Sequence, residues 1–293
     1  MPEGKIMKAL SGFYYVKDEE RVIQCRGRGV FRKQKLTPLV GDYVEYQAEN
    51  DQEGYILDLK SRKNELVRPP IANIDQAVLV FSAIEPDFST SLLDRFLVLV
   101  ESHDIDPVIC ISKMDLLNDE QTERINRFAE DYRKIGYPVI LSSAKWEDGM
   151  DQLKPWLEDQ VTVFAGQSGV GKSSILNALN PALELKTDAI SNSLGRGKHT
   201  TRHVELIGIG SGFVADTPGF SALEFTELEV DQLPLCFPEM VKASDDCKFR
   251  GCLHLNEPKC AVKEYVDKGE IKEYRYQHYQ QFHEEIKSRK PRY

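Results

Sequence analysis

The chain has 293 residues, of which 41% are hydrophobic and 29% are charged, a composition typical of soluble globular proteins. Its net charge of −9 argues against a broad nucleic-acid-binding surface, and no apolar run reaches the length of a membrane span. The first ten residues lack the apolar core and the small-residue cleavage site of a signal peptide. We therefore expect a cytoplasmic protein with more than one domain.

Short strand patterns fill residues 1–66. The segments GFYYV, RVIQCRG, DYVEYQA and GYILDLK mix β-branched and aromatic residues and are separated by turn-forming residues. This spacing predicts an all-β OB-type barrel, and two adjacent prolines mark its boundary with the next domain. Five basic residues on one barrel loop are candidate RNA contacts, with a solvated loop as the alternative: Arg26, Arg28, Arg32, Lys33 and Lys35.

Residues 67–225 alternate strand patterns with helical ones. The apolar runs QAVLVFSA, PVICIS, PVILSS and VTVFAG are separated by segments such as SLLDRFLVLVESH, whose apolar residues recur at three- and four-residue steps. This alternation predicts a parallel sheet covered on both faces, and two further strands, VELIGI and FVADT, follow. We expect a central α/β domain there and a mostly helical domain over residues 226–293.

A phosphate-binding loop joins one of these strands to a helix. The sequence GQSGVGKS over residues 166–173 fits G-x-x-x-x-G-K-[ST] at every defined position. Backbone N–H groups would surround the phosphate oxygens, Lys172 would bridge the β- and γ-phosphates, and Ser173 would bind Mg²⁺. The residues predicted to contact the nucleotide here are Gly166, Gln167, Ser168, Gly169, Val170, Gly171, Lys172, Ser173 and Ser174.

Two later segments fit the switch regions of a P-loop hydrolase. Asp216 ends an apolar strand and can hold Mg²⁺, while Gly219 can bring its N–H close to the γ-phosphate. The polar segment 195–203 contains Thr200 and Thr201, either of which can complete the Mg²⁺ shell. A plain solvated loop is the alternative for that segment.

Phe220 follows Gly219, where many GTPases carry a glutamine that orients the attacking water. Because phenylalanine cannot orient water, we expect slow intrinsic hydrolysis. His199 is a candidate substitute for that glutamine, and a surface or partner contact is the alternative for this histidine.

Two loops upstream of the phosphate loop have the chemistry to read guanine. The first is Ser112, Lys113, Met114 and Asp115, and the second is Ser143, Ala144 and Lys145; each follows a strand. The Asp115 carboxylate can accept hydrogen bonds from guanine N1–H and the 2-amino group, which adenine lacks. Lys113 would cover the ring with its aliphatic stem, and the Ala144 N–H would meet O6. Both loops in one P-loop domain predict specificity for GTP and GDP.

The C-terminal segment carries the sequence Cys247-x4-Cys252-x-His254-x5-Cys260. Three thiolates and one imidazole are a set that closes a tetrahedral structural Zn²⁺ site, with no position open for catalysis. In a cytoplasmic protein, clustered cysteines indicate metal rather than disulfides, and free or redox-active thiols are the alternative. Cys25 and Cys110 stand alone in apolar strand patterns and are expected to be buried thiols.

The order of the nucleotide-site segments is unusual. It runs from the base loop through the Ser-Ala-Lys loop and the phosphate loop to switch one and switch two. Rotated by two places, this is the order of an ordinary small GTPase, which indicates a circular permutation. Switch two then runs almost directly into the C-terminal domain, so a movement caused by loss of the γ-phosphate would pass covalently to that domain.

The permuted order, the preceding barrel and the Cys-x4-Cys-x-His-x5-Cys spacing together resemble the ribosome small subunit-dependent GTPases of the RsgA (YjeQ/YloQ) family, over essentially the whole chain. The resemblance implies GTP hydrolysis to GDP and phosphate, stimulated by the small (30S) subunit, with a role late in that subunit's maturation. It implies one structural Zn²⁺, Mg²⁺ with GTP and contact with 16S rRNA; we further expect a monomer with no membrane partner. Ser112 stands where asparagine is usual, which predicts a looser base pocket and a less absolute preference for GTP over ATP.

Two other interpretations stay open. One is a permuted GTPase that serves another ribonucleoprotein, such as the large subunit; the barrel and the zinc domain argue against it. The other is a zinc RNA-binding module for which GTP is only a structural ligand. The presence of Lys172, Ser173 and Asp216 argues against that second interpretation.

Overall fold

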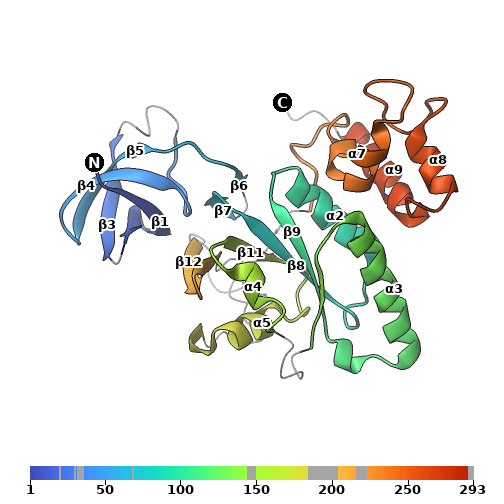
Figure 1. Ribbon diagram of the computed structural model, residues 1–293. Helices are drawn as coiled ribbons and strands as arrows, with labels where there is room; N and C mark the ends of the chain where they lie inside the picture. The colour runs from blue at the N-terminus through green and yellow to red at the C-terminus, as the bar shows by residue number, and fades with distance from the viewer. Residues whose placement is uncertain are drawn as a thin grey trace.

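The computed structural model describes residues 1–19, 21–29, 31, 36–67, 69–143, 150–183, 204–215 and 223–289. Figure 1 shows strands at the N-terminal end, an α/β part in the centre and a helical C-terminal part. This succession confirms the predicted fold classes. None of the helices in the described ranges combines the length and the apolar composition required to cross a bilayer.

The N-terminal strands close into a barrel. They are β1 (Glu3–Leu10), β2 (Phe13–Asp18), β3 (Arg21–Gly27), β4 (Tyr43–Asn50) and β5 (Glu53–Leu59). Neighbours run in the order β1–β2–β3–β5–β4, and β4 pairs again with β1, which closes a five-stranded barrel of the OB type. Four of these strands were predicted from the sequence. Strand β1 was not, because its Lys, Met, Ala and Leu residues suit a helix as well as a strand.

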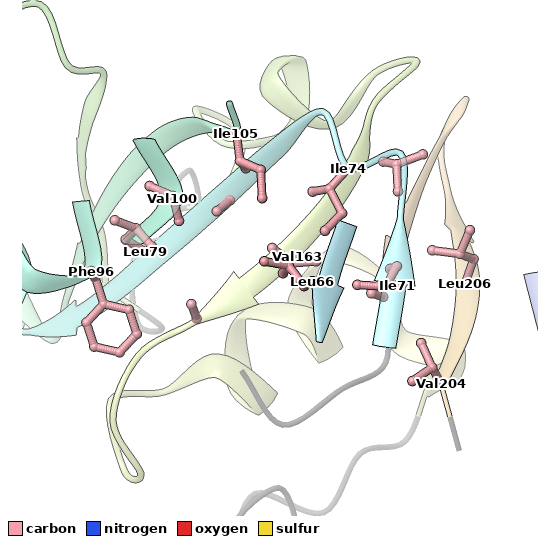
Figure 2. Close-up of a cluster of buried hydrophobic side chains, with 14 of the residues drawn as sticks. Leu66, Ile71, Ile74, Leu79, Phe96, Val100, Ile105, Val163, Val204 and Leu206 are labelled. Atoms are coloured by element: carbon pink, nitrogen blue, oxygen red, sulfur yellow. The ribbon is translucent and has the colours of Figure 1, made fainter. Parts of the chain in front are cut away.

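A short hairpin, β6 (Glu65–Val67) and β7 (Pro70–Ala72), links the barrel to the central domain. Leu66 and Ile71 of this hairpin are buried in the same cluster as Val163 and Leu206 of the central sheet, as Figure 2 shows. The sequence predicted only a domain boundary here. The hairpin therefore joins the barrel to the central domain by packing as well as by the chain.

The central sheet has the strand order β10–β9–β8–β11–β13–β12. Its strands are β8 (Gln76–Ser82), β9 (Asp106–Ser112), β10 (Val139–Leu141), β11 (Val161–Ala165), β12 (Val204–Ile209) and β13 (Gly212–Ala215). All pairings are parallel except that of β12 with β13, because the two residues between these strands are too few for a parallel crossover. At the far edge, β12 pairs with β1, so barrel and central domain share one continuous sheet.

Helices cover both faces of this sheet, as predicted. They are α2 (Thr90–Glu101), α3 (Asp119–Ile135), α4 (Lys154–Leu157) and α5 (Lys172–Leu179). Leu79 and Phe81 of β8 pack in the cluster of α2 and α3, while Val78 and Val80 pack in the cluster of α4 and α5. Burial on both sides explains why β8 has no exposed residue and reads as one apolar run.

The C-terminal part consists of α7 (Pro238–Ser244), α8 (Ala261–Asp267) and α9 (Glu273–Ser288), preceded by a 3₁₀ turn at Leu233–Cys236. Two further 3₁₀ turns lie at Met114–Leu116 and Pro181–Leu183. Helix α9 packs against α2 of the central domain (Figure 1). The C-terminal helices therefore dock on the α/β domain rather than standing apart from it.

A buried ionic network fixes this contact between domains. The Arg275 guanidinium of α9 lies 2.6 Å from the Asp94 carboxylate of α2, and both side chains are fully buried. Arg275 also donates to Glu239 of α7 at 2.7 Å. Asp94 accepts further hydrogen bonds from Tyr132 Oη at 2.7 Å and from the His278 ring at 2.6 Å. Four helices of two domains, α2, α3, α7 and α9, thus meet at one carboxylate and one guanidinium.

Candidate nucleotide-binding and zinc sites

The phosphate loop lies between a buried strand and a helix. Strand β11 is buried throughout, and Lys172 is the first residue of α5. Gly166, Gly169 and Gly171 have φ angles of 143°, 80° and 97°, which favour glycine. At Gly166 a Cβ atom would lie 2.1 Å from the Val80 carbonyl oxygen, so the close approach of the loop to β8 also requires glycine.

Lys172 folds back over this loop. Its Nζ donates hydrogen bonds to the carbonyl oxygens of Gly166 at 2.8 Å and Gln167 at 2.6 Å. Burial lowers the pKa of Lys172 from 10.5 to about 8. A phosphate group in the loop would stabilise the ammonium form. Because α5 begins without a side-chain cap, its first N–H groups are available to the same anion.

The base loop follows β9 at the same edge of the sheet. Lys113 has a φ angle of 61°, and its Nζ donates to the Glu85 carbonyl oxygen. Asp115 Oδ1 accepts a 2.5 Å hydrogen bond from Ser143 Oγ, which orients the carboxylate predicted to read guanine. Met114, predicted as a nucleotide contact, is 6% exposed, and its N–H donates to the Ser142 carbonyl oxygen. Its place is therefore beneath the loop rather than on its surface.

Ser112 joins the base loop directly to the phosphate loop. Its Oγ donates to the Val170 carbonyl oxygen at 2.6 Å, across 58 residues of sequence. The two loops predicted to hold opposite ends of a nucleotide are thus in contact, although the base loop comes first in the chain. The Glu85 loop, which follows β8, was not predicted, although the carboxyl ends of parallel strands share one edge of a sheet and this loop therefore lies at the same edge.

Several predicted site residues lie outside the described residues. These are Ala144 and Lys145 of the base site, His199, Thr200 and Thr201 of switch one, and Asp216, Gly219 and Phe220 of switch two. Of the candidate RNA contacts, Arg32, Lys33 and Lys35 also lie outside. Arg26 and Arg28 are exposed, and the Arg26 guanidinium lies 4.8 Å from the centre of the Phe13 ring. The roles assigned to all these residues stay predictions.

The chain that leaves switch two is anchored to both neighbouring domains. Arg95 of α2 donates to the Leu223 carbonyl oxygen at 3.0 Å and forms a bidentate pair with Glu285 of α9 at 2.8 and 2.5 Å. Its guanidinium lies over the rings of Phe225 and Phe282, at 4.7 and 4.8 Å. Arg95 thus connects α2, the segment after switch two and the C-terminal helix.

The four predicted zinc ligands come together. The ligand atoms of Cys247, Cys252, His254 and Cys260 all lie within 4.8 Å of one another. His254 Nδ1 is 3.7 Å from Cys247 Sγ and 3.4 Å from Cys260 Sγ. A tetrahedral Zn²⁺ with ordinary Zn–S and Zn–N bonds sets sulfur and nitrogen about 3.6 Å apart, so the donor set fits this ion.

The backbone around these ligands is held by other side chains. Tyr276 Oη donates to the His254 carbonyl oxygen at 2.6 Å, and Tyr279 Oη donates to that of Leu253 at 2.5 Å. The Glu257 carboxylate accepts the N–H groups of Leu253 and Leu255 at 2.8 and 2.9 Å. Helix α9, which carries both tyrosines, therefore supports the ligand loop as well as the contact with α2. This is the outer-shell support expected of a structural metal site.

Comparison with known sequences places the chain in a family. The profile of the RsgA GTPase family matches residues 59–226, and that of the RsgA N-terminal domain matches residues 3–56. The chain belongs to the RsgA family. Curated RsgA relatives named small ribosomal subunit biogenesis GTPase, from Bacillus cereus and Bacillus subtilis, are each 66% identical to it over the full length of both chains.

Solved structures of RsgA relatives have the same fold. The crystal structure of YloQ, described as a circularly permuted GTPase, matches with a TM-score of 0.87 and 61% identity, over 100% of this chain and 97% of that one. YjeQ from Thermotoga maritima matches with a TM-score of 0.87 and 38% identity, over 99% of both chains. These matches confirm the family resemblance and the permuted order inferred from the motifs.

Proposed function

We propose that this chain is a GTPase that binds the small ribosomal subunit and hydrolyses GTP to GDP and phosphate late in the subunit's maturation. The observation that carries the proposal is the contact between the Asp115 base loop and the Lys172 phosphate loop, in a chain 66% identical over its length to small ribosomal subunit biogenesis GTPases. We further propose that hydrolysis depends on Mg²⁺ and is stimulated by the subunit.

Each residue of the site has a proposed task. Asp115, held by Ser143, accepts the guanine edge, and Lys172 binds the β- and γ-phosphate oxygens. Ser173, Thr201 and Asp216 would hold Mg²⁺, which would supply positive charge beside the phosphate oxygens. Gly219 contributes its N–H to the γ-phosphate. Phe220 cannot orient the water, so His199 or a group from the subunit takes that task.

The flanking domains are the proposed ribosome contacts, with boundaries at 1–66, 67–225 and 226–293. The exposed Arg26 and Arg28 support binding of 16S rRNA by the barrel, as OB folds bind oligonucleotides through their strands and loops. Arg95 supports a path by which movement of switch two reaches α9. We propose one structural Zn²⁺ per chain, a monomer, and action in the cytoplasm, where the subunits are.

Multiple-turnover hydrolysis by the purified full-length protein tests the proposal. GTP and ATP are compared without ribosomes, with small subunits and with large subunits, at saturating and chelated Mg²⁺. We expect GTP to be preferred and small subunits alone to raise the rate at least about tenfold. Lys172→Ala is the inactive control. Stimulation by large subunits, or tight GTP binding without turnover, would replace the proposal by one of the other two interpretations.

Salt dependence tests the barrel contact separately. Charge reversal at Arg26 and Arg28 should weaken small-subunit binding and reduce the slope of log affinity against log salt by about one for each phosphate that is no longer neutralised. Lys154→Glu, an exposed charge reversal in α4, is the matched control. An unchanged slope would remove the barrel from the RNA contact and leave the GTPase proposal standing.

A further inference from the structure

A cleft of about 520 Å³ lies at the amino edge of the central sheet, where its parallel strands begin. Gln76 and Asp106, the first residues of β8 and β9, line it together with Trp156 of α4 and Pro238 of α7. The nucleotide loops follow the opposite, carboxyl ends of the same strands. The volume falls in the range of ligand-binding pockets, and the proposed binding of GTP does not account for this cleft.

Much of the lining is apolar and rich in proline. The apolar lining residues, apart from the aromatic ones, are Pro107, Val108, Ile135, Pro138, Pro155 and Pro238. Trp156 adds a large ring that is 42% exposed. Gln76 Nε2 donates to the Trp156 carbonyl oxygen and, at 2.9 Å, to Thr162 Oγ1 of β11, which ties the backbone at Trp156 to the sheet. The cleft therefore presents an aromatic ring from a fixed position.

The charged groups of the cleft are all acidic. They are Glu101, Asp106 and Glu158, and no lysine, arginine or histidine is among the described residues that line it. Neither Asp106 nor Glu158 has an ion-pair partner within the described ranges. Glu101 accepts a hydrogen bond from Tyr137 Oη at 3.0 Å, and burial raises the pKa of this carboxyl. A cation in the cleft would stabilise its ionised form.

Helix ends add to this negative field. The helices run back along the sheet, so α2 and α3 finish at this edge, at Glu101 and Ile135, and both residues line the cleft. The carboxyl end of a helix carries partial negative charge. One cation already binds there, because Lys242 Nζ of α7 donates to the Ile135 carbonyl oxygen at 3.3 Å. The edge therefore attracts cations and repels phosphate.

We propose that this cleft binds an arginine side chain from a basic segment of a protein of the small subunit. A planar guanidinium can stack on the Trp156 ring while its N–H groups donate to carboxylates, a combination that the ammonium of lysine matches less well. Proteins that bind rRNA carry basic segments, because lysine and arginine supply the contacts to phosphate. The proposal rests on the proposed function, which supplies the small subunit as the source of the segment.

The overall charge of the chain agrees with a protein partner at this edge. A net charge of −9 disfavours a broad RNA-binding surface, but it favours encounter with a basic polypeptide. The exposed arginines of the barrel, Arg26 and Arg28, lie in another domain. Contacts with RNA and with a basic protein segment would then use separate parts of the molecule.

NMR of the full-length protein with isotope-labelled tryptophan tests the cleft directly. The chain has two tryptophans, and Trp156→Phe identifies the indole N–H signal of Trp156. The probes are acetyl-Gly-Arg-Gly-amide and the same peptide with lysine or with citrulline, which keeps the shape of arginine without its charge. We expect the arginine peptide to shift the Trp156 signal saturably and to bind at least about fivefold more tightly than the citrulline peptide. No shift, or equal affinity for the citrulline or the lysine peptide, would overturn the proposal.

Removal of two carboxylates tests the partner. Asp106→Asn combined with Glu158→Gln should weaken binding of the arginine peptide and of small subunits, each at least about fivefold. Glu123→Gln combined with Glu130→Gln is the matched control, since it removes the same charge from exposed positions of α3. Equal loss of subunit binding in the two double variants would overturn the proposal, because net charge rather than the cleft would be responsible.

The two readouts separate the cleft from the proposed function. Weaker peptide binding with unchanged subunit binding would refute the small-subunit protein as the partner. If the unmodified protein does not bind small subunits at all, the proposed function fails, whereas the peptide titration still decides whether the cleft binds arginine. That titration uses the unmodified protein, so it stands even if the double variant does not fold.

Discussion

Replacing Arg275 by methionine should release the C-terminal helix from the α/β domain. The substitution keeps much of the side-chain volume but removes the guanidinium that pairs with Asp94 at 2.6 Å and Glu239 at 2.7 Å. Asp94 would keep only Tyr132 and His278 as partners, at zero exposure. Breaking a buried pair in this way costs roughly 3–5 kcal/mol, which is roughly a hundred- to several thousand-fold in an opening equilibrium.

Hydrogen exchange of the α9 amides measures this opening without assuming two-state unfolding of the whole chain. Arg275→Met should speed their exchange by at least about a hundredfold. Arg127→Met is the matched control, because its guanidinium lies 3.9 Å from Glu123 with 71% of the side chain exposed. That pair contributes at most about 0.5 kcal/mol. Similar exchange of α9 in the two variants would refute the argument that this network holds the domains together.

Three further outcomes are expected. Nucleotide affinity should fall as pH rises through about 8, because Lys172 without nucleotide then loses the proton that phosphate binding requires. Equilibrium titration of the nucleotide at several pH values checks this, and Lys172→Arg should abolish the pH dependence. Gly166→Ala should weaken nucleotide binding far more than Gly169→Ala. A Cβ on residue 166 would lie 2.1 Å from the Val80 carbonyl oxygen, whereas a Cβ on residue 169 would meet nothing within 4 Å. Equal nucleotide affinities of the two variants would contradict this. Cys260→Ala should lower the zinc content from one ion per chain towards none, which elemental analysis measures. It should also reduce the melting temperature of the C-terminal domain, which calorimetry measures, while basal GTP hydrolysis stays unchanged.

The sequence was most informative where function is carried by short, local patterns. The phosphate loop could be predicted from the sequence because its glycines and Lys172 must stand at fixed spacing around the start of one helix. The zinc ligands could be predicted because they fall within fourteen residues, from Cys247 to Cys260. Strands β8, β9 and β11 were legible because burial on both faces makes them continuous apolar runs.

Contacts between residues far apart in the chain could not be predicted from the sequence. The sequence around Arg275 does not predict that its partner is Asp94, 181 residues earlier, because an arginine in a polar helix normally faces water. Strand β1 was missed because its extended form depends on pairing with β2, β4 and β12 rather than on its own residues. The cleft at the amino edge of the sheet likewise becomes visible only when the fold brings Asp106 and Trp156 to one place.

The pairing of β1 with β12 bears on how the chain folds during synthesis. The last barrel strand ends at residue 59 and β12 begins at residue 204, so the 144 residues 60–203 separate them. At about 5–20 residues per second, the ribosome takes roughly 7–30 s to make that stretch. Throughout this interval the part of the β1 edge that later pairs with β12, at Lys8 and Ala9, has no strand partner.

An unpaired strand edge is a template for aggregation, and lysine on such an edge is a common protection. Lys8 lies on this part of β1, and it later pairs with Glu205 of β12 at 2.7 Å. We therefore expect Lys8 to protect the exposed edge of the nascent barrel until β12 is made, and then to pair with Glu205 when β12 docks.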